Sequence, residues 1–543
     1  MSKLMPNYGW VQNTSNLSTI RETIDLVPED GIKHSDLMNA IKKYREQSDS
    51  LPTKWTWDAR CRIKAICASG LVKLDRNIQG YYPTELGIAL QKCPKSDEYF
   101  KGKRILTSEE KELFRKGLLT NPPVVRVLEL LVNERKALNI GLSKYDIGAQ
   151  LGFVGDIGFT HYDPEWIVSN GGNFTNKEGD ADKWARTIIS WLIQCELAVK
   201  ADEGADILGM TLTLYKATPL AENVLRYYSR SIKKYVPSEM LCSNHHSFPT
   251  LVQKRRVLLL QSLQSGAKTL SELVSRLQNH GLDVDDQTIR FEIISLKQAG
   301  FRIANEGNIY KLEDKVELDI NPSLLENTVE EESDIEKQIE RIVTRYEATL
   351  PPRLVDNLMR YGYDGIYGKE FESAVSRYFK FLGYKTTYLG QGHGRVPDVI
   401  ARYIDDTVYA RSYGIIIDAK ATSERYTFAA NDVRKMKEYI LNIGGELMKE
   451  MIARHAFAFI SSEFVDNVKK PLEEIATETG INGTAIRVED LLELGNGVSQ
   501  GKMNISSLYN YYTNNDRFDI NNIVQYSRLV PGRPNHGKVA EKR

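Results

Sequence analysis

The chain has 543 residues, of which 41% are hydrophobic and 27% are charged. These proportions are ordinary for soluble globular proteins, so they favour neither a globally disordered chain nor a membrane protein. Lysine plus arginine and aspartate plus glutamate both total 72, and the net charge of zero gives no global indication of a polyanionic partner. A chain of this length exceeds one hydrophobic core, so we expect several domains.

Targeting signals are not recognisable in the sequence. No apolar run reaches the length of about 18 residues that a membrane-spanning helix needs, and residues 1–10 lack the apolar core of a signal peptide. The 5 cysteines are odd in number and show no CxxC spacing. We therefore expect a cytoplasmic protein with reduced thiols and no membrane partner.

Residues 1–105 are predicted to form a first winged-helix-like subdomain. The apolar spacing from Ile20 to Lys92 is mainly helical, with a compact helix in "DARCRIKAICASGLVKL" that ends at Gly70. Two short extended stretches follow, and the second ends in "PTELG". Any other small helical domain is the alternative.

Residues 106–240 are predicted to form a second subdomain. A helix opens after the proline pair of "NPPVVRVLELLVNER", where missing N–H groups cost little. Ser143 can cap a short helix in "LSKYDIGAQLGF". The segment "DADKWARTIISWLIQCELAV" has an apolar face with Trp184, Ile188, Trp191 and Leu192, and an opposite face with Lys183 and Arg186.

Residues 241–320 have the order helix, helix, helix, hairpin, which again indicates a winged helix. We expect the surface of its third helix to offer Asp285, Asp286 and Glu292 beside Arg290, a poor electrostatic match to phosphate. This subdomain is therefore expected to pack against other domains.

An acidic and then helical stretch at residues 321–349, "NPSLLENTVEEESDIEKQIERIVTRYE", is interpreted as a linker. Residues 350–543 then change to helix, alternating strands, helix and strand, which indicates an α/β domain. The predicted fold class is a multidomain α+β chain with three winged-helix-like subdomains followed by an α/β domain.

The polar residues of two predicted strands carry the main chemical signal. "GRVPDVIARYI" puts Asp398 at the start of one strand, and "YGIIIDAKA" puts Asp418 and Lys420 at the end of another. The short isoleucine run is typical of a buried strand. Because residues two apart share a face of a strand, Asp418 and Lys420 point the same way, while Ala419 points elsewhere.

Two carboxylates and an amine suit the hydrolysis of a phosphodiester. Asp398 and Asp418 can hold a hard divalent cation through oxygen ligands, helped by the backbone carbonyl of Ala419 and by waters, as suits Mg²⁺. Lys420 can orient or help deprotonate the attacking water, or stabilise the phosphorane, and the sequence does not decide between these roles. The alternative is chance placement on a surface, because Pro-Asp pairs are also common in turns.

A further acid, Glu372, lies near the apolar stripe of the helix "YGKEFESAVSRYFKFLGY". A carboxylate close to a buried face needs a partner, and a contact to the metal's ligands or water is one. The alternative is a solvated charge on the helix surface.

Several segments together resemble the FokI-like type IIS restriction endonucleases over most of the chain. They are "YGWVQN", "PPVVRVLELL", "KYDIGAQLGF", "GFTHY", "NKEGDADKWARTIISWL", and "PD" with "DAK". The resemblance implies three winged-helix-related DNA-recognition subdomains and one PD-(D/E)xK nuclease domain, with Asp398, Asp418 and Lys420 at the catalytic positions. Between Leu17 and Lys54 this chain is shorter than the family pattern.

The same resemblance implies a set of DNA-reading residues. Asn and Gln can pair with adenine, Arg and Lys with guanine, and Glu with the cytosine amino group. Residues at positions that approach bases are Gln12, Asn13, Asn176, Glu178, Lys183 and Arg186, with Trp57 as a looser match. The implied target is a short asymmetric double-stranded DNA site such as GGATG. For Lys183 and Arg186, phosphate contact or a plain solvated charge is the alternative.

The family cuts both strands by pairing two nuclease domains through a helix with an acid and, one turn later, an arginine. "NDVRKMKEYILN" puts Arg434 and Glu438 at those places with the signs exchanged. A two-fold interface is self-complementary, so Arg434 of one copy can still meet Glu438 of the other in a transient homodimer. An ordinary pair within one exposed helix is the alternative.

Two other functions compete with a double-strand endonuclease. A nicking enzyme would have the same catalytic residues but no working dimer helix. A non-catalytic DNA-binding regulator could be built from winged helices, although Asp398, Asp418 and Lys420 speak against it. No GxxxxGK[ST] loop occurs, so a nucleotide-driven translocase is not indicated.

Overall fold

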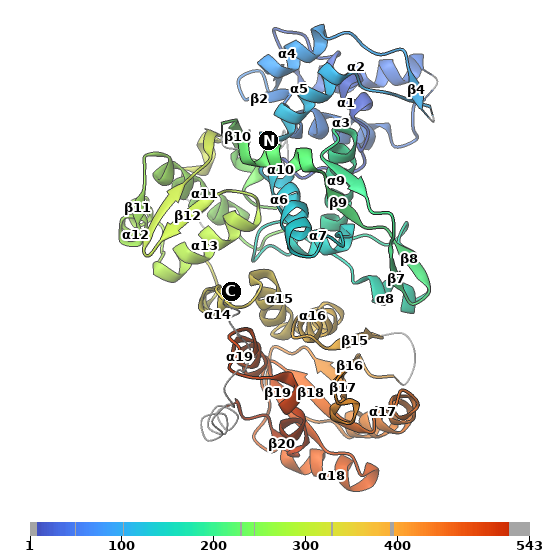
Figure 1. Cartoon of the computed structure of the whole chain (residues 1–543). Helices are drawn as coiled ribbons and strands as arrows, with labels where there is room; N and C mark the ends of the chain where they lie inside the picture. The colour runs from blue at the N-terminus through green and yellow to red at the C-terminus, as the bar shows by residue number, and fades with distance from the viewer. Residues whose placement is uncertain are drawn as a thin grey trace, which may run out of the picture. The chain divides into compact units, whose positions relative to one another are not determined.

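The structure is a computed structural model of the chain (Figure 1). It describes residues 8–520, except residues 49, 101, 228–230, 244, 327–329 and 391–395. The chain divides into two compact units, one ending at Thr344 and one beginning at Arg345. In these described residues, no helix is both long and apolar enough to cross a membrane.

The first module has the helix–strand–helix–helix–strand–strand order of a winged helix. Its elements are α1 (Leu17–Ile24), β1 (Ile32–Lys33), α2 (His34–Gln47), α3 (Trp55–Ala68), β2 (Val72–Asp75) and β3 (Gly80–Pro83), followed by α4 (Glu85–Lys92). The strands form an antiparallel sheet in the order β1-β3-β2. The winged-helix prediction is therefore confirmed for this part of the chain.

The second module repeats this order with an insertion before its third helix. A hairpin of β4 (Tyr99–Phe100) and β5 (Lys103–Arg104) leads into it. Its helices are α5 (Ser108–Leu118), α6 (Pro122–Ala137), α7 (Lys144–Gln150), α8 (Pro164–Ser169), α9 (Asp180–Gln194) and α10 (Pro219–Tyr227). Its strands are β6 (Ala198–Lys200), β7 (Ala205–Ile207), β8 (Met210–Leu212) and β9 (Tyr215–Ala217).

Two local contacts complete the second module. Leu142 bridges Tyr215 of β9, so the chain before α7 takes the place of the first strand of a winged helix. The Ser143 side chain accepts a hydrogen bond from the Asp146 N–H, as the sequence predicted for this helix start. The helix α9 therefore occupies the position of the third helix in the winged-helix order.

The third module consists of α11 (Pro249–Gln264), β11 (Lys268–Thr269), α12 (Leu270–Asn279), α13 (Asp286–Gln298), β12 (Ile303–Glu306) and β13 (Ile309–Leu312). The expectation that Glu292 lies on the surface of α13 is wrong. Glu292 is 1% exposed and accepts a 2.7 Å hydrogen bond from Arg256 Nε. On the same helix, the Ser295 hydroxyl donates to the Val154 carbonyl of the second module, so α13 packs inward.

A pair of parallel strands closes the third module onto the rest of its unit. β10 (Lys233–Pro237) pairs with β14 (Lys315–Asp319), and these strands lie on either side of the whole third module in the sequence. Next to this pair, the Lys234 ammonium lies 2.6 Å from Asp314, and both side chains are 0% exposed. One hydrophobic cluster runs from Tyr8 to Leu324 and so joins the three modules into one core.

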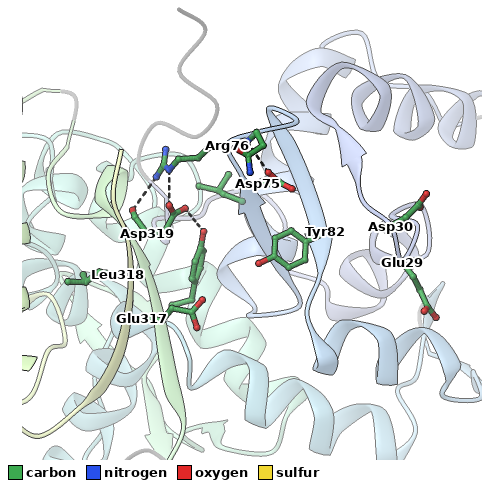
Figure 2. A pocket seen from close by; sticks show the side chains of 11 residues that line it. Glu29, Asp30, Asp75, Arg76, Tyr82, Glu317, Leu318 and Asp319 are labelled. Atoms are coloured by element: carbon green, nitrogen blue, oxygen red, sulfur yellow. Dashed lines mark hydrogen bonds and ion pairs between the residues drawn. The ribbon is translucent and has the colours of Figure 1, made fainter. Parts of the chain in front are cut away.

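An open cavity of about 670 Å³ lies between the first module and β14. Figure 2 shows Arg76, from the turn after β2, pointing toward Asp319 of β14. Arg76 also donates to both carboxylate oxygens of Glu239, and Lys73 pairs with Glu317 at 2.7 Å. These partly buried pairs fix the wing of the first module to the β10–β14 strands.

The stretch predicted as a linker contains α14 (Asp334–Tyr346). Before the second unit begins, it is attached to α11 by nearly buried charges. Arg255 lies 2.7 Å from Glu332 and 3.6 Å from Glu340, and Glu330 accepts a hydrogen bond from the Leu251 N–H. Residues 330–344 therefore pack on the third module.

The second unit contains a six-stranded sheet in the order β15-β16-β17-β18-β19-β20. The first three strands pair antiparallel and the rest pair parallel, which confirms the predicted α/β domain. Its strands are β15 (Lys385–Tyr388), β16 (Val399–Tyr403), β17 (Tyr413–Lys420), β18 (Arg454–Ser461), β19 (Gly483–Arg487) and β20 (Asp516–Arg517).

Helices pack against this sheet in two groups. They are α15 (Pro352–Gly362), α16 (Gly368–Phe381), α17 (Ala430–Lys449), α18 (Lys469–Thr479) and α19 (Val488–Ser499). The buried core formed by α17 and α18 includes Ile416 of β17. Because side chains alternate along a strand, Ile415 and Ile417 face the opposite side of the sheet, and α16 contacts the same strand.

Candidate active site

The register of two antiparallel strands brings the two predicted acids together. Val399 of β16 is paired with Ile417 of β17, so Asp398, just before β16, lies opposite Asp418. The Asp398 carboxylate accepts a 2.8 Å hydrogen bond from the Ala419 N–H, and Asp418 is only 3% exposed. Burial, with the charges of Asp418 and Glu372, raises the pKa of Asp398 well above its usual value.

Lys420 lies on the same strand face as Asp418, as the alternation predicted. Its Nζ is 2.9 Å from Asp418 Oδ2 and 3.6 Å from Asp432 Oδ1. Burial alone would lower the pKa of Lys420, but the charges of Asp418, Asp398 and Asp432 raise it above its usual value. The amine is therefore a cation beside the carboxylates and is suited to stabilising negative charge on a phosphate.

Glu372 is buried beside this pair and is not a solvated helix charge. It lies on α16 and is 2% exposed. The Tyr388 hydroxyl is 3.5 Å from its Oε2, and its charge acts on Asp398. The sequence left two alternatives for Glu372, a solvated helix charge and a contact near the acid pair. Its burial favours the second alternative.

The donor set fits a hard divalent cation. In the part of the chain that the structure describes, no group of three or more His, Cys, Asp or Glu side chains could hold a metal ion. An ion here would be held by the carboxylates of Asp398 and Asp418 and the Ala419 carbonyl, with waters or phosphate oxygens as its other ligands. Mg²⁺ is commonly bound by one or two carboxylates in this way, and a cation between two facing acids relieves their repulsion.

The N-terminal segment with two of the predicted DNA-reading residues lies along α9. The Trp191 indole donates to the Thr14 carbonyl at 2.8 Å, and the Ser190 hydroxyl donates to the Ser15 carbonyl at 2.9 Å. Gln12 and Asn13 directly precede these contacts, and Asn13 is exposed with a φ of 70°. Both residues are therefore held next to the helix that carries Lys183 and Arg186.

Within the second module, Glu178 is nearly buried and binds two basic side chains. Its side chain is 9% exposed, and it accepts hydrogen bonds from Arg186 Nε at 2.8 Å and from Lys144. Burial alone would raise the pKa of Glu178, but the hydrogen bonds from Arg186 and Lys144 lower it. Lys183 pairs with Asp180 at 2.9 Å.

The two other predicted readers are accessible. Asn176 is exposed in the loop before α9. Trp57 is 44% exposed on α3, in the first module. Their roles in DNA binding stay predictions.

The residues predicted to pair two copies are close to each other within one helix. Arg434 and Glu438 of α17 are 3.6 Å apart, and their side chains are 58% and 24% exposed. Arg434 also donates to Asn431 at 2.8 Å. The intrahelical alternative is therefore satisfied in a single chain, and the intermolecular pair stays a prediction.

Two residues beside Lys420 were not singled out from the sequence. Asp432 lies in the first turn of α17, and its Oδ2 accepts a 2.6 Å hydrogen bond from the Tyr426 hydroxyl. An acid in the first turn of the helix that follows the "DAK" strand is the signal that could have indicated it. A tyrosine in the connecting loop gives no comparable signal.

A Pro-Asp pair before one strand and Asp-Ala-Lys at the end of its antiparallel neighbour define a nuclease domain of the PD-(D/E)xK class. Comparison with family models supports this class: residues 329–519 match the FokI cleavage domain, and residues 250–308 match the FokI D3 domain.

Known proteins give the same result along most of the chain. The type II restriction enzyme FokI of Planomicrobium okeanokoites is 25% identical over 496 residues, covering 85% of this chain and 82% of that protein. The type II restriction enzyme StsI of Streptococcus sanguinis is 25% identical over 491 residues, covering 82% and 78%. Most of this chain is thus similar to the type II restriction enzymes FokI and StsI. Its residues 329–519 match the cleavage domain of FokI.

The solved structures of FokI agree in fold. The structure of restriction endonuclease FokI has a TM-score of 0.65 at 21% identity, over 95% of this chain and 100% of the other. FokI bound to DNA gives a TM-score of 0.65 at 22% identity over the same shares. At this identity the likeness concerns the fold alone.

Proposed function

We propose that this protein binds a short asymmetric double-stranded DNA site, such as GGATG, and hydrolyses both strands a short fixed distance away with Mg²⁺. The observation that carries this proposal is the placement of Asp398 opposite Asp418, with the Lys420 ammonium 2.9 Å from the second acid. A non-catalytic regulator would have no use for buried acids that repel one another.

The front unit has the features of a DNA reader. We assign residues 8–105 and 106–240 to two DNA-recognition subdomains, and residues 241–320 to a subdomain that packs between domains. Asn13 and Gln12 lie beside α9, from which Lys183 and Arg186 can reach base edges or phosphates. Glu178 holds Arg186 in place, so its proposed contact with DNA is shared with a role in orienting that guanidinium.

In the cleavage reaction, each residue of the site has a task that follows from its position. Asp398 and Asp418 would hold the cation, and Glu372 constrains the acid pair from the α16 side. Lys420, as a cation, stabilises the charge that builds up on the phosphate and orients the attacking water. Bound Mg²⁺ would supply Lewis-acid polarisation of the phosphate and lower the pKa of the attacking water.

Cutting both strands needs two active sites, since each chain contains one such acid pair among its described residues. We propose a transient homodimer through the nuclease domain, with Arg434 of one copy meeting Glu438 of the other. A two-fold axis makes this contact twice. A pair that is already satisfied within its own helix gains little from such an exchange, so we expect weak association.

The test is to incubate the protein and Mg²⁺ with a supercoiled plasmid of known sequence and to sequence the ends of the product. We expect linear DNA cut at a fixed offset from one recurring site, and no cutting when the divalent cation is chelated. Open circles without linear product would instead show a nicking enzyme.

The Asp418→Ala variant assigns the site. We expect it to lose cutting and to keep DNA binding, because Asp418 lies in the unit that begins at Arg345. Asp466→Ala is the matched control, since Asp466 is an acid of the same unit whose side chain is 93% exposed. Persistent cutting by Asp418→Ala, or equal loss in the control, would refute this active site.

A further inference from the structure

The first turn of α17 faces the catalytic lysine. Asp432 is 17% exposed, and its two carboxylate oxygens have different partners: Oδ1 lies 3.6 Å from Lys420 Nζ, and Oδ2 accepts from the Tyr426 hydroxyl at 2.6 Å. Asp418 is the other acid next to the amine. Asp418 is also a proposed metal ligand. When it binds a metal, Asp432 would still be free of the metal and could hold the amine.

An acid at this helix position normally has a different use. In α5 and α12 the acid three residues after the N-cap returns to the backbone N–H of the cap, with Glu110 at 2.9 Å from Thr107 N and Glu272 at 2.7 Å from Thr269 N. Asp432 holds the same position in α17, whose N-cap Ala429 has no side-chain cap. Its carboxylate is turned to the tyrosine and the lysine, so helix capping does not explain it.

Tyr426 is fixed rigidly enough to orient Asp432. Its N–H donates to the Glu463 carbonyl at 2.8 Å, and its carbonyl accepts from the Val465 N–H at 3.1 Å. Its ring packs edge-on against Phe428 and Phe464. A hydroxyl held in this way can keep one oxygen of Asp432 occupied and direct the other toward Lys420.

We propose that Asp432, held by the Tyr426 hydroxyl, is a positioning residue for the Lys420 amine during phosphodiester cleavage. This inference rests on the proposed nuclease function. Asp432 contacts Lys420 and Tyr426, and it acts by limiting where the amine can lie. Asp432 also lies two residues before Arg434 on the same helix. A contact between two copies through α17 would therefore lie close to the residue that positions Lys420.

The test uses the full chain with enzyme in excess over a plasmid that the unsubstituted protein cuts. We expect Asp432→Asn to slow the single-turnover cleavage rate about 10- to 100-fold, since small displacements of a catalytic group have effects of this size. DNA affinity, measured without divalent cation, should stay unchanged. Tyr426→Phe should slow the same step, and Asp432→Glu should recover part of the rate because it restores the charge.

The matched control is Asp490→Asn. Asp490 lies at the same position of α19, but its carboxylate pairs with Arg487 at 2.7 Å, so we expect a normal cleavage rate. Asp432→Asn with an unchanged cleavage rate, or with a loss that Asp432→Glu does not relieve, would overturn the inference. If the unsubstituted protein cuts no plasmid, the proposed function itself fails, which is a separate result.

Discussion

The buried pair of Lys234 and Asp314 allows a sharp stability prediction, because its two partners are not equally supported. The Lys234 ammonium has Asp314 at 2.6 Å and the Gly300 carbonyl at 3.3 Å. Asp314 also accepts from Arg302, through its N–H at 2.8 Å and its Nε at 3.1 Å. Removing the acid therefore takes away the direct ion-pair partner of the buried ammonium and leaves it the Gly300 carbonyl and the charge of Glu129. Removing the lysine leaves an acid that is still paired with Arg302.

The expected free energies differ accordingly. Breaking a buried ion pair so that one charge is left uncompensated costs about 3–5 kcal/mol, and this applies to Asp314→Asn. Losing one hydrogen bond from a group that keeps its others costs about 1 kcal/mol, and this applies to Lys234→Met. The two variants should thus differ although they delete the same contact.

Amide hydrogen exchange of the β10 and β14 strands is the suitable assay, since a chain with two units need not unfold in one step. Asp314→Asn should speed exchange of these amides by about two to three and a half orders of magnitude, as a factor of ten corresponds to about 1.4 kcal/mol. Lys234→Met should speed it by about fivefold. The exposed Asp283 serves as a control through Asp283→Asn. Equal acceleration in the two buried variants would refute the reasoning.

Two further predictions concern the second unit. Arg434→Glu and Glu438→Arg should each reduce linear product from a supercoiled plasmid, and the double exchange should restore it if the residues pair across a two-fold axis; a double variant no better than the singles would rule out that pairing. Burial lowers the pKa of His455 below its ordinary value of 6.5. The unfolded state therefore binds a proton at this residue more tightly than the folded state does. His455 thus does not reduce the free energy of unfolding above about pH 6.5, and it lowers this free energy as the pH drops below that value. His455→Gln should flatten this acid dependence of the melting temperature, and an unchanged profile would show that another group causes it.

The two acids of the proposed active site were predictable because the signal is local. A β-branched run followed by Asp418 and Lys420 fixes which side chains share a strand face, and Asp398 opens a strand of its own. Their approach follows once the two strands pair with Val399 opposite Ile417. The three winged-helix modules were equally predictable, because helices and hairpins produce recognisable hydrophobic periodicity in the sequence.

What the sequence could not supply are contacts between distant segments. Helical spacing placed Glu292 on a surface, because periodicity does not say that a second face of α13 is covered by Arg256. The partner of Asp432 is a loop tyrosine that has no periodic pattern. The parallel pairing of β10 with β14 joins two short strands with a whole module between them, and non-local pairing of this kind leaves little local trace.

The β10–β14 pair brings the two ends of the third module onto one short parallel ladder, while a shared hydrophobic core ties the module to the rest of its unit. The chain leaves at Pro237 and returns at Lys315, which lies beside Lys233 at the other end of the same ladder. A replacement segment would have to run back along one five-residue strand, about 13–17 Å. Because α11 also holds Glu332 and Glu340, such a deletion would release residues 330–344. The segment before the unit that begins at Arg345 would then have fewer contacts. If the protein cuts at a fixed offset as proposed, we expect the cut positions to spread over a wider range.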